Sequence, residues 1–413
     1  MAFAKGVRAF FIFTGLCLAS AVNGAEAIGL KSDAPPIRVR TSHNQKLVLV
    51  SGFGLRINGE EILKTNLPKK FSFRVSAEAT GWSIDLGRDG HKVQPVHLTS
   101  DEVEVVGDNL TVNGQPTADR FILIKNSHAV AKGQRGPASG LRFDVVSVLA
   151  LDDYLKGVVP SEMPSRWPLE SLKAQVVASR SYALTEMKVH QGESFHLDDS
   201  ILHQVFNWSK FLGASQVEQE RINKAINETS DEILADRSGG PYRAYFHSDC
   251  GGHTEEPSAV WGGAHKNGTV ADQHCALNAK GQWAEEIRRE EFSRLVAQYF
   301  NLRESVEVTS LSVGALSASG RVQNLVLALN DSGQTQKRVL TSQALRQIFG
   351  FTRIKSANFH FDLDSTRVKF SGRGSGHGVG LCQQGAKYMA LTGSDYRAIL
   401  KRYYPAAQLA HRL

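Results

Sequence analysis

The stretch Gly157-Val-Val-Pro-Ser-Glu-Met-Pro-Ser-Arg-Trp-Pro-Leu-Glu-Ser-Leu-Lys-Ala-Gln-Val-Val-Ala-Ser-Arg-Ser-Tyr-Ala-Leu184 decides how the rest of the chain is interpreted. Its three prolines each remove a backbone donor and disfavour helical dihedral angles in the preceding residue, so we expect it to begin as an extended loop. A helix follows, with Ser165 as a cap and Pro168 in the first turn. This arrangement places Glu162 just outside the N-terminus of a helix.

The helix in this stretch has an apolar stripe and a cationic side. Leu169, Leu172 and Val176 fall close to one face at helical spacing. Lys173 and Arg180 share a second face, which we expect to look toward the loop that carries the acid. Charged residues near the start of a helix are commonly solvated, so this pattern alone does not identify a site.

Three further segments occur in a fixed order after the central stretch. They are Tyr245-Phe-His-Ser-Asp-Cys-Gly-Gly-His-Thr-Glu255 with Val260-Trp-Gly-Gly263, Gly374-Ser-Gly-His-Gly-Val-Gly-Leu-Cys-Gln-Gln-Gly-Ala386, and Ile399-Leu-Lys-Arg-Tyr-Tyr-Pro405. Together the four blocks resemble the stage II sporulation protein D (SpoIID/LytB) family. Members of that family are exported bacterial proteins that act on peptidoglycan, some as lytic transglycosylases and some as amidase enhancers.

The resemblance implies a catalytic role for Glu162. Glycoside hydrolases generally use two carboxyl groups, and neither Glu170 nor Glu186 is an evident partner for Glu162 across a cleft. A lytic transglycosylase works with one acid, because a hydroxyl of the substrate itself attacks and leaves an anhydro-muramic end. For this role we expect apolar neighbours such as Met163 and Trp167 to raise the pKa of Glu162.

Further residues are expected to bind the substrate. The resemblance implies that the segment from residue 247 lines the substrate groove, and that the glycine-rich loop packs beside the acid and presents a histidine and a glutamine to a sugar. We hypothesise that the two helix cations bind acidic or acetamido groups of the glycan. The residues assigned to substrate binding are Lys173, Arg180, Tyr182, His247, Ser248, His377 and Gln383.

The glycine-rich loop has alternative interpretations. Glycine at every second position from Gly372 also suits a loop that only packs closely against its neighbours. A phosphate-binding loop is excluded, because the spacing matches neither the Walker pattern nor the dinucleotide fingerprint.

Two groups of residues raise the possibility of zinc. His196, Asp199 and His203 are acceptable donors, and some family members hold zinc in this region. Their spacing fits no closed structural zinc pattern, which favours a surface loop. We therefore expect no cofactor, with zinc as the alternative.

The cysteines of the C-terminal half predict either a disulfide or a metal site. Cys250 and Cys275 enclose a loop suited to a disulfide in an oxidising compartment, although the sequence leaves the connectivity with Cys382 open. The alternative is a metal site made of Cys250, His253, His274 and Cys275.

The N-terminus is typical of a secretory signal. Lys5 and Arg8 precede an apolar run at 9–22, and Ala25-Glu-Ala27 is a small-residue cleavage site. No later stretch is long and apolar enough to span a membrane, so we expect export to the periplasm or the cell wall. The net charge of +7 suits a partner that is an anionic polymer. Dispersed basic residues without a recognisable motif argue against nucleic acid.

The pattern of elements predicts an α+β fold with three parts: a signal peptide at 1–27, a β-rich module at 28–140 and a SpoIID-like catalytic domain at 141–413. A turn-rich connector at 132–140 marks the boundary. Asn58-Gly59, Asp89-Gly90 and Asn113-Gly114 are predicted turns. Strands are predicted at 37–40, 46–50, 71–75, 103–106, 110–112 and 141–150, with further strands within 306–370. Helices are predicted at 152–156, 217–233, 284–301 and 341–349.

These patterns favour a peptidoglycan lytic transglycosylase. The first alternative is a non-catalytic protein that binds glycan and stimulates a separate cell-wall amidase. The second is a metal-dependent wall hydrolase that uses the histidines.

Overall fold

The computed structural model describes residues 35–61, 70–86, 95–126, 141–200, 203–263, 267–276 and 279–411. The predicted signal peptide, the Asp89-Gly90 turn and the 132–140 connector lie outside these residues. Helices and mostly antiparallel strands are mixed along the chain, which confirms the predicted α+β class.

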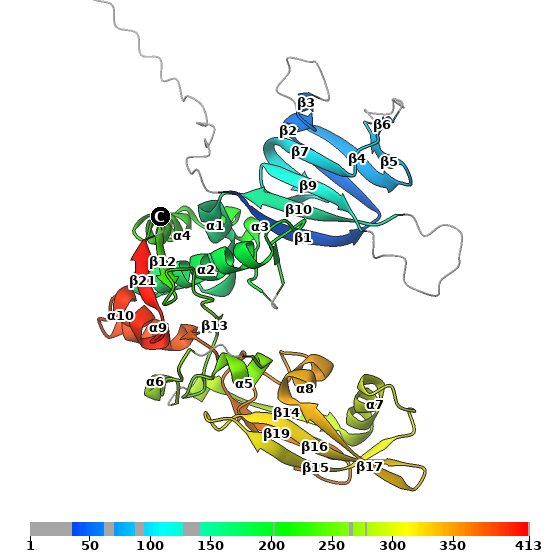
Figure 1. Ribbon diagram of the computed structural model, residues 1–413, viewed down its shortest axis with the longest axis vertical. Helices are drawn as coiled ribbons and strands as arrows, with labels where there is room; N and C mark the ends of the chain where they lie inside the picture. The colour runs from blue at the N-terminus through cyan, green and yellow to red at the C-terminus, as the bar shows by residue number, and fades with distance from the viewer. Residues whose placement is uncertain are drawn as a thin grey trace, which may run out of the picture. The chain divides into compact units, whose positions relative to one another are not determined.

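A large sheet occupies the N-terminal part of the chain (Figure 1). Its strands are β1 (Ile37–Gln45), β2 (Leu47–Ile57), β3 (Glu60–Glu61), β4 (Phe71–Glu78), β5 (Gly81–Asp85), β6 (Val96–Leu98), β7 (Glu102–Val112), β8 (Gln115–Pro116), β9 (Arg120–Lys125), β10 (Phe143–Leu149) and β11 (Leu197–Asp198). Among the described residues the order is β11-β1-β10-β9-β7-β2-β4-β5-β6, with β3 beside β2 and β8 beside β7. The predicted strands at 103–106 and 110–112 are parts of the single strand β7.

Strand β10 connects the large sheet to the central helices and contributes to the cores of both. All seven of its residues are buried, and it pairs antiparallel with β1 on one side and with β9 on the other. Phe143 belongs to the apolar core of the sheet, whereas Leu149 belongs to the core beneath the helices. The 132–140 connector therefore falls between two adjacent strands of one sheet. The domain division at residue 140 stays a prediction.

The central helices pack beside this sheet (Figure 1). They are α1 (Leu151–Glu162), α2 (Leu169–Val189), α3 (Trp208–Leu212) and α4 (Gln216–Asn227). Their shared core includes Ile37 of β1, Tyr154 and Val158 of α1, and Leu172 and Val176 of α2, all fully buried. The predicted helix at 217–233 is shorter than expected, because β12 (Glu232–Ala235) begins within that range and pairs with β21 (Gln408–His411).

The predicted extended loop at the start of the central stretch is wrong. Helix α1 continues through Pro160 to Glu162, and only 163–168 form the connection to α2. Pro160 has no N–H to donate to the carbonyl four residues before it, yet the helix continues for two more residues, and the Ser161 hydroxyl donates to the Gly157 carbonyl at 2.7 Å. Pro168, rather than Ser165, is the residue that precedes α2.

Residues 282–373 form a second folded part with its own core. Its strands are β14 (Gln282–Arg288), β15 (Glu307–Leu316), β16 (Val322–Asp331), β17 (Gln334–Thr341), β18 (Phe359–Leu363) and β19 (Arg367–Arg373), with helices α7 (Arg289–Tyr299) and α8 (Ser342–Phe349). These elements bury one apolar cluster that includes Phe292, Leu327 and Phe370. We refer to residues 282–373 as the insert, since they separate two of the family blocks.

The predicted helix at 284–301 is wrong in its first half. Residues 282–288 form β14, which pairs antiparallel with β19 and buries Trp283 and Ile287 on one face. Helix α7 begins only at Arg289. A spacing of four between two buried residues fits a strand as well as a helix, so periodicity did not decide between them.

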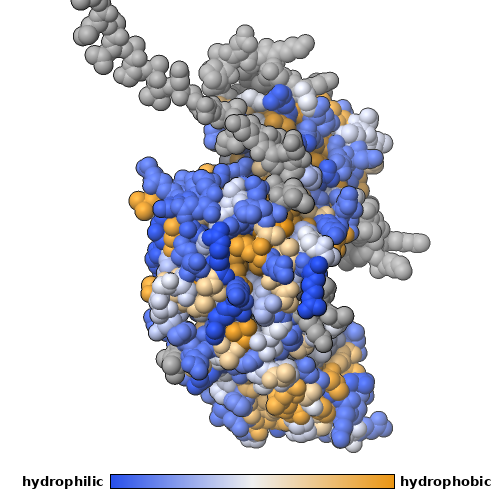
Figure 2. Space-filling view, turned by 60° about the vertical axis from the view of Figure 1, so that its left-hand side comes forward, coloured by the Kyte–Doolittle hydropathy of each residue, from blue (hydrophilic) through white to orange (hydrophobic). Residues whose placement is uncertain are grey.

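The remaining elements connect the insert to the central helices. They are β13 (Phe246–His247), α5 (Pro257–Trp261), α6 (Gln273–Ala276), η1 (Ala279–Gly281), β20 (Leu381–Cys382), α9 (Gln383–Leu391) and α10 (Tyr396–Tyr403). Strands β13 and β20 pair in parallel, so the second and third family blocks lie side by side. None of the described helices combines the length and apolarity needed to span a membrane. Hydrophobic and hydrophilic patches are interspersed on the face in Figure 2.

Candidate active site

A cavity of about 570 Å³ lies where the family blocks meet. Helix α2, the segment after β11, the β13 region, α5, α8 and the glycine-rich loop after β19 all contribute to its wall, together with the end of α1. The residues that line it are Glu162, Tyr182, Glu186, His203, Val205, Arg243, Tyr245, Phe246, His247, Ser248, Trp261, Gln343, Arg346, Phe351, Ser375, Gly376 and His377.

Glu162 borders this cavity and a second one. It is the last residue of α1, and its Oε1 atom accepts a hydrogen bond from the Val205 backbone N–H at 2.7 Å. The second cavity, of about 470 Å³, is lined by Pro160, Arg166 and Lys210 among others, and Glu162 lines it too. A polymer lying through both cavities would therefore pass the carboxyl group of Glu162.

The environment of Glu162 favours the protonated acid. Burial raises its pKa from 4.5 to about 7, against the opposing effects of the Val205 N–H, the Lys210 charge and a hydrogen bond with Gln383. Its place at the C-terminal end of a helix acts in the same direction as burial, because the helix dipole disfavours an anion there. The upward shift expected from the sequence is present. Met163 and Trp167 belong to the core cluster next to it.

Aromatic rings form one wall of the cavity. Tyr245 and Trp261 stack with ring centroids 4.5 Å apart, and Trp261 and His377 follow at 5.0 Å. Tyr182 meets Tyr245 edge to face at 5.8 Å. Trp261 is 46% exposed although it is large and apolar. Such a surface suits the apolar face of a sugar ring.

Two histidines approach each other across the paired blocks. The rings of His247 and His377 are 5.6 Å apart. Nδ1 of His377 accepts a hydrogen bond from the Val379 N–H at 3.0 Å, and burial together with His247 lowers the pKa of His377, which is therefore neutral at pH 7. A Cβ atom on Gly376, whose φ is +104°, would lie 2.9 Å from the Cβ of His247. The close approach of these strands therefore requires glycine in the loop.

The two predicted helix cations do not line either cavity. Lys173 pairs with Glu170 at 2.8 Å and with Glu228 at 2.6 Å. Arg180 is only 1% exposed and donates to the backbone carbonyls of Thr229 and Glu232 at 2.8 and 3.1 Å. The expectation that these cations face the acid and bind glycan is not supported by their positions. Both cations lie on α2 as predicted, but their side chains contact other residues of the protein and do not face a cavity.

Of the other five residues predicted to bind substrate, four line the cavity and one does not. Tyr182, His247, Ser248 and His377 line the same cavity as Glu162. Gln383 is buried behind it, where its amide donates to Gln175 at 3.3 Å. Their contact with substrate stays a prediction.

Comparison with known proteins identifies the family. Residues 139–235 match the family described as Stage II sporulation protein (SpoIID), and residues 272–380 match a domain of unknown function, DUF8618. The chain belongs to the SpoIID family. The second match covers the whole insert and a few residues on either side, so the insert interrupts the SpoIID blocks with a separately described domain.

Similar proteins cover part of this chain. A protein of Brachyspira hyodysenteriae is 34% identical over 262 residues, which are 63% of this chain and 66% of that protein. The amidase enhancer of Bacillus subtilis is 28% identical over 296 residues, or 62% of this chain and 40% of that protein. Stage II sporulation protein D of Bacillus subtilis is 27% identical over 276 residues, or 64% and 76%.

Several cavity residues lie outside the predicted site of this SpoIID protein. Glu186 pairs with Arg243 at 2.7 Å and lines the same cavity as Glu162, although its place in the sequence gave no evidence for this. Arg346 and Phe351 come from the insert, and no family block contains them. Tyr245 and Trp261 belong to the second family block, and their aromatic character is the signal from which their place in the cavity wall could have been predicted.

The three residues of the alternative histidine metal site do not gather in the part of the chain that the structure describes. Nδ1 of His196 accepts from the Arg38 N–H at 3.0 Å, and His203 lines the cavity. Asp199 instead lies near Asp198 and the exposed His43.

The described cysteines, Cys250, Cys275 and Cys382, are all free and buried. They gather with Asp249, whereas Nδ1 of His253 lies 2.8 Å from the Thr254 carbonyl and the His274 ring stacks on Tyr388 at 4.0 Å. Neither histidine of the alternative metal set, His253 or His274, therefore belongs to this group.

Proposed function

We propose that this SpoIID protein is an exported lytic transglycosylase that cleaves the glycan strands of peptidoglycan. The observation that carries the proposal is Glu162, a carboxyl group that is protonated up to about pH 7 and borders two cavities at once. Such an acid is suited to protonate the oxygen of a glycosidic bond, with the strand extending into a cavity on either side.

Glu162 would act first as an acid and then as a base. Its proton passes to the leaving oxygen as positive charge develops on the sugar, and the carboxylate that remains accepts a proton from a hydroxyl of the same sugar. That hydroxyl closes onto the anomeric carbon and leaves an anhydro end. The Val205 N–H and Lys210 favour the carboxylate formed after the first transfer, while burial favours the acid that precedes it.

The rest of the cavity would position the strand. The exposed face of Trp261 would stack on a sugar ring, and the neutral His377 would contact the sugar beside it. Arg243 places positive charge on the wall beside Glu186, where it would suit the carboxylates of muramic acid and its peptide, whereas Arg346 is 4% exposed and donates to the backbone carbonyls of Ile354 and Lys355. Arg243 would therefore take the role that the sequence assigned to Lys173 and Arg180.

A second carboxylate is present but has a different partner. Glu186 is 4% exposed, and Arg243 and His190 lie within 2.7 and 3.5 Å of its oxygens. This pairing favours a role in which Glu186 orients Arg243. One carboxyl group with a raised pKa is what a transglycosylase requires.

The second candidate function is a non-catalytic one. The relative named amidase enhancer favours it, because that protein matches 62% of this chain. In that case the groove would bind glycan and present it to a separate cell-wall amidase. The expected partners under both functions are peptidoglycan strands, with the amidase added in the second.

Product analysis separates these functions. The purified protein is incubated with peptide-free glycan strands, and the products are identified by mass spectrometry with and without a chelator. Anhydro ends support the transglycosylase. An absence of products, together with faster peptide release when an amidase is added to intact peptidoglycan, supports the enhancer. Reducing ends that disappear with chelator would overturn both in favour of a metal-dependent hydrolase.

A further inference from the structure

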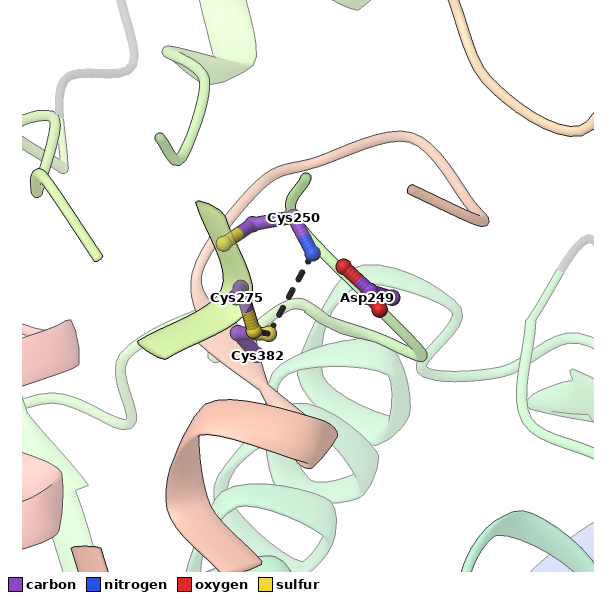
Figure 3. Close-up of side chains that lie close together, drawn as sticks. All are labelled: Asp249, Cys250, Cys275 and Cys382. Carbon is purple, nitrogen blue, oxygen red and sulfur yellow. Dashed lines mark hydrogen bonds between the residues drawn. The ribbon is translucent and has the colours of Figure 1, made fainter. Parts of the chain in front are cut away.

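A second chemical centre lies away from Glu162. It consists of the side chains of Asp249, Cys250, Cys275 and Cys382, which we call the thiol cluster (Figure 3). Each residue offers one ligand atom, and these atoms all lie within 4.8 Å of one another. All four residues are buried, with exposed fractions of 5% or less.

The sulfur positions suit a tetrahedral metal better than a disulfide. Sγ of Cys275 lies 3.3 Å from Sγ of Cys382. Zinc–sulfur bonds of about 2.3 Å place the sulfurs of a tetrahedral site about 3.8 Å apart, so small side-chain rotations would admit the ion. A disulfide would join only two of the three sulfurs and leave a third thiol buried beside it.

The protein surrounds the cluster with donors that stabilise thiolates. The backbone N–H groups of Cys250 and Gly385 point at Sγ of Cys382 over 3.2 and 3.4 Å, and the first of these bonds is drawn in Figure 3. Cys382 also precedes α9, so its sulfur lies at a helix N-terminus. Thiolates are the form that binds zinc.

A buried cation lies next to the cluster. Arg321 of the insert is 3% exposed and donates to the backbone carbonyls of Cys250 and His253 at 2.5 and 2.7 Å. Its positive charge would offset part of the excess negative charge that three thiolates and a carboxylate leave around a divalent ion. The outer surroundings of a metal site are therefore in place.

We propose that Cys250, Cys275 and Cys382, with a carboxylate oxygen of Asp249, bind one zinc ion. Binding releases the thiol protons and joins three segments that the sequence separates. Cys250 follows β13, Cys275 lies just before the insert, and Cys382 lies just after it. The ion would hold both connections of the insert together and would fix the turn after His247 and Ser248 on the cavity wall. Its role is structural, because none of the four residues lines the cavity.

The test measures metal binding directly. The protein is purified without chelators, its zinc content is determined by mass spectrometry, and zinc is then replaced with Co²⁺. We expect about one zinc ion per chain and, with cobalt, the thiolate charge-transfer and intense visible bands of a tetrahedral sulfur site. Cys382→Ser removes one of the three thiolates, so it should bind the metal poorly and weaken the charge-transfer band. Asp249→Asn should keep it but bind zinc at least about tenfold more weakly.

Matched controls are the two histidines that the sequence suggested as ligands. His253→Ala and His274→Ala should both keep stoichiometric zinc. If the cysteine variant does not fold, alkylation of the wild-type protein decides instead, since Cys250, Cys275 and Cys382 should resist alkylation until zinc is removed. A disulfide in the intact-mass spectrum, or reduced protein that takes up no zinc or cobalt, would overturn the proposal. These readouts use no glycan, so they succeed or fail independently of the transglycosylase test.

Discussion

At the scale of single residues, the proposed chemistry depends on where Glu162 lies. The sequence pointed to it through the proline-rich family block, and the position at the end of α1 explains its acidity better than the predicted loop does. A loop at the N-terminus of a helix would have stabilised the anion, whereas the end of α1 and the surrounding burial stabilise the acid. The sequence pointed to the right residue for this cavity, but it placed Glu162 in a loop before a helix, whereas the structure places it at the end of α1.

The raised pKa of Glu162 predicts a pH-dependent stability. In the folded protein the acid is kept up to about pH 7, but in the unfolded chain it ionises near 4.5. The free energy of unfolding should therefore fall as pH rises from about 4.5 to about 7 and stay low above that, by at most roughly 3 kcal/mol. Urea unfolding of the wild type and of Glu162→Gln at several pH values checks this. The variant should gain on the wild type as pH rises, and a constant difference would contradict the shifted pKa.

Trp261 should contribute to binding rather than to turnover. Its ring is stacked on Tyr245 with one part left exposed to the cavity. Trp261→Ala should raise the KM for glycan about threefold to tenfold with little change in kcat, because it removes one stacking surface. Steady-state kinetics measure this, and Trp261→Phe should restore most of the affinity. A loss confined to kcat would show that the ring acts on the reacting bond instead.

At the scale of elements, the sequence could predict features that depend on local residue types. It could not predict contacts between residues that are far apart in the chain. The periodicity of α2 and the turn at Asn113-Gly114 were predictable, because local residue types determine them. The direction in which Arg180 points was not, because its acceptors are carbonyls of residues 229 and 232, about fifty positions away in the chain. For the same reason β14 was predicted as a helix, since its partner strand β19 is distant in sequence.

Arg180 should therefore stabilise the fold without binding substrate. Arg180→Met leaves two backbone carbonyls without their buried donor and should cost about 3 kcal/mol or more. Lys173→Met removes ion pairs closer to the surface and should cost about 1 kcal/mol or less. Denaturant unfolding and glycan kinetics are measured on both, and the KM should stay unchanged in each. A stably folded Arg180→Met protein with weakened glycan binding would restore this residue to the site.

At the scale of the whole molecule, the cavity is built from parts that no single family block contains. The sequence predicted the class, five strands of the large sheet (β1, β2, β4, β7 and β10) and the candidate acid, but it did not predict that the insert supplies Arg346 and Phe351 to the wall. It also did not predict which cysteines meet, because Cys275 and Cys382 lie on opposite sides of the insert in the chain. Contacts of this kind depend on tertiary packing and leave no local pattern.

The net charge of +7 predicts salt-sensitive attachment to the cell wall. Peptidoglycan carries carboxylates, so binding of the protein to insoluble sacculi should weaken as salt screens the attraction. Sedimentation of the protein with sacculi at low and high salt measures this, with the neutral polymer chitin as the comparison. Equal binding to sacculi at both salt concentrations would contradict an electrostatic contribution.

The most direct test compares Glu162→Gln with Glu186→Gln, since both carboxyl groups line one cavity and Glu186 is held in an ion pair with Arg243. Each protein is checked for folding by circular dichroism and then incubated with purified glycan strands, and anhydro-muramic ends are counted by mass spectrometry. We predict that Glu162→Gln forms these ends at least about a thousandfold more slowly than the wild type, while Glu186→Gln retains measurable activity. Anhydro ends formed at the wild-type rate by folded Glu162→Gln would contradict the role given to this carboxyl group.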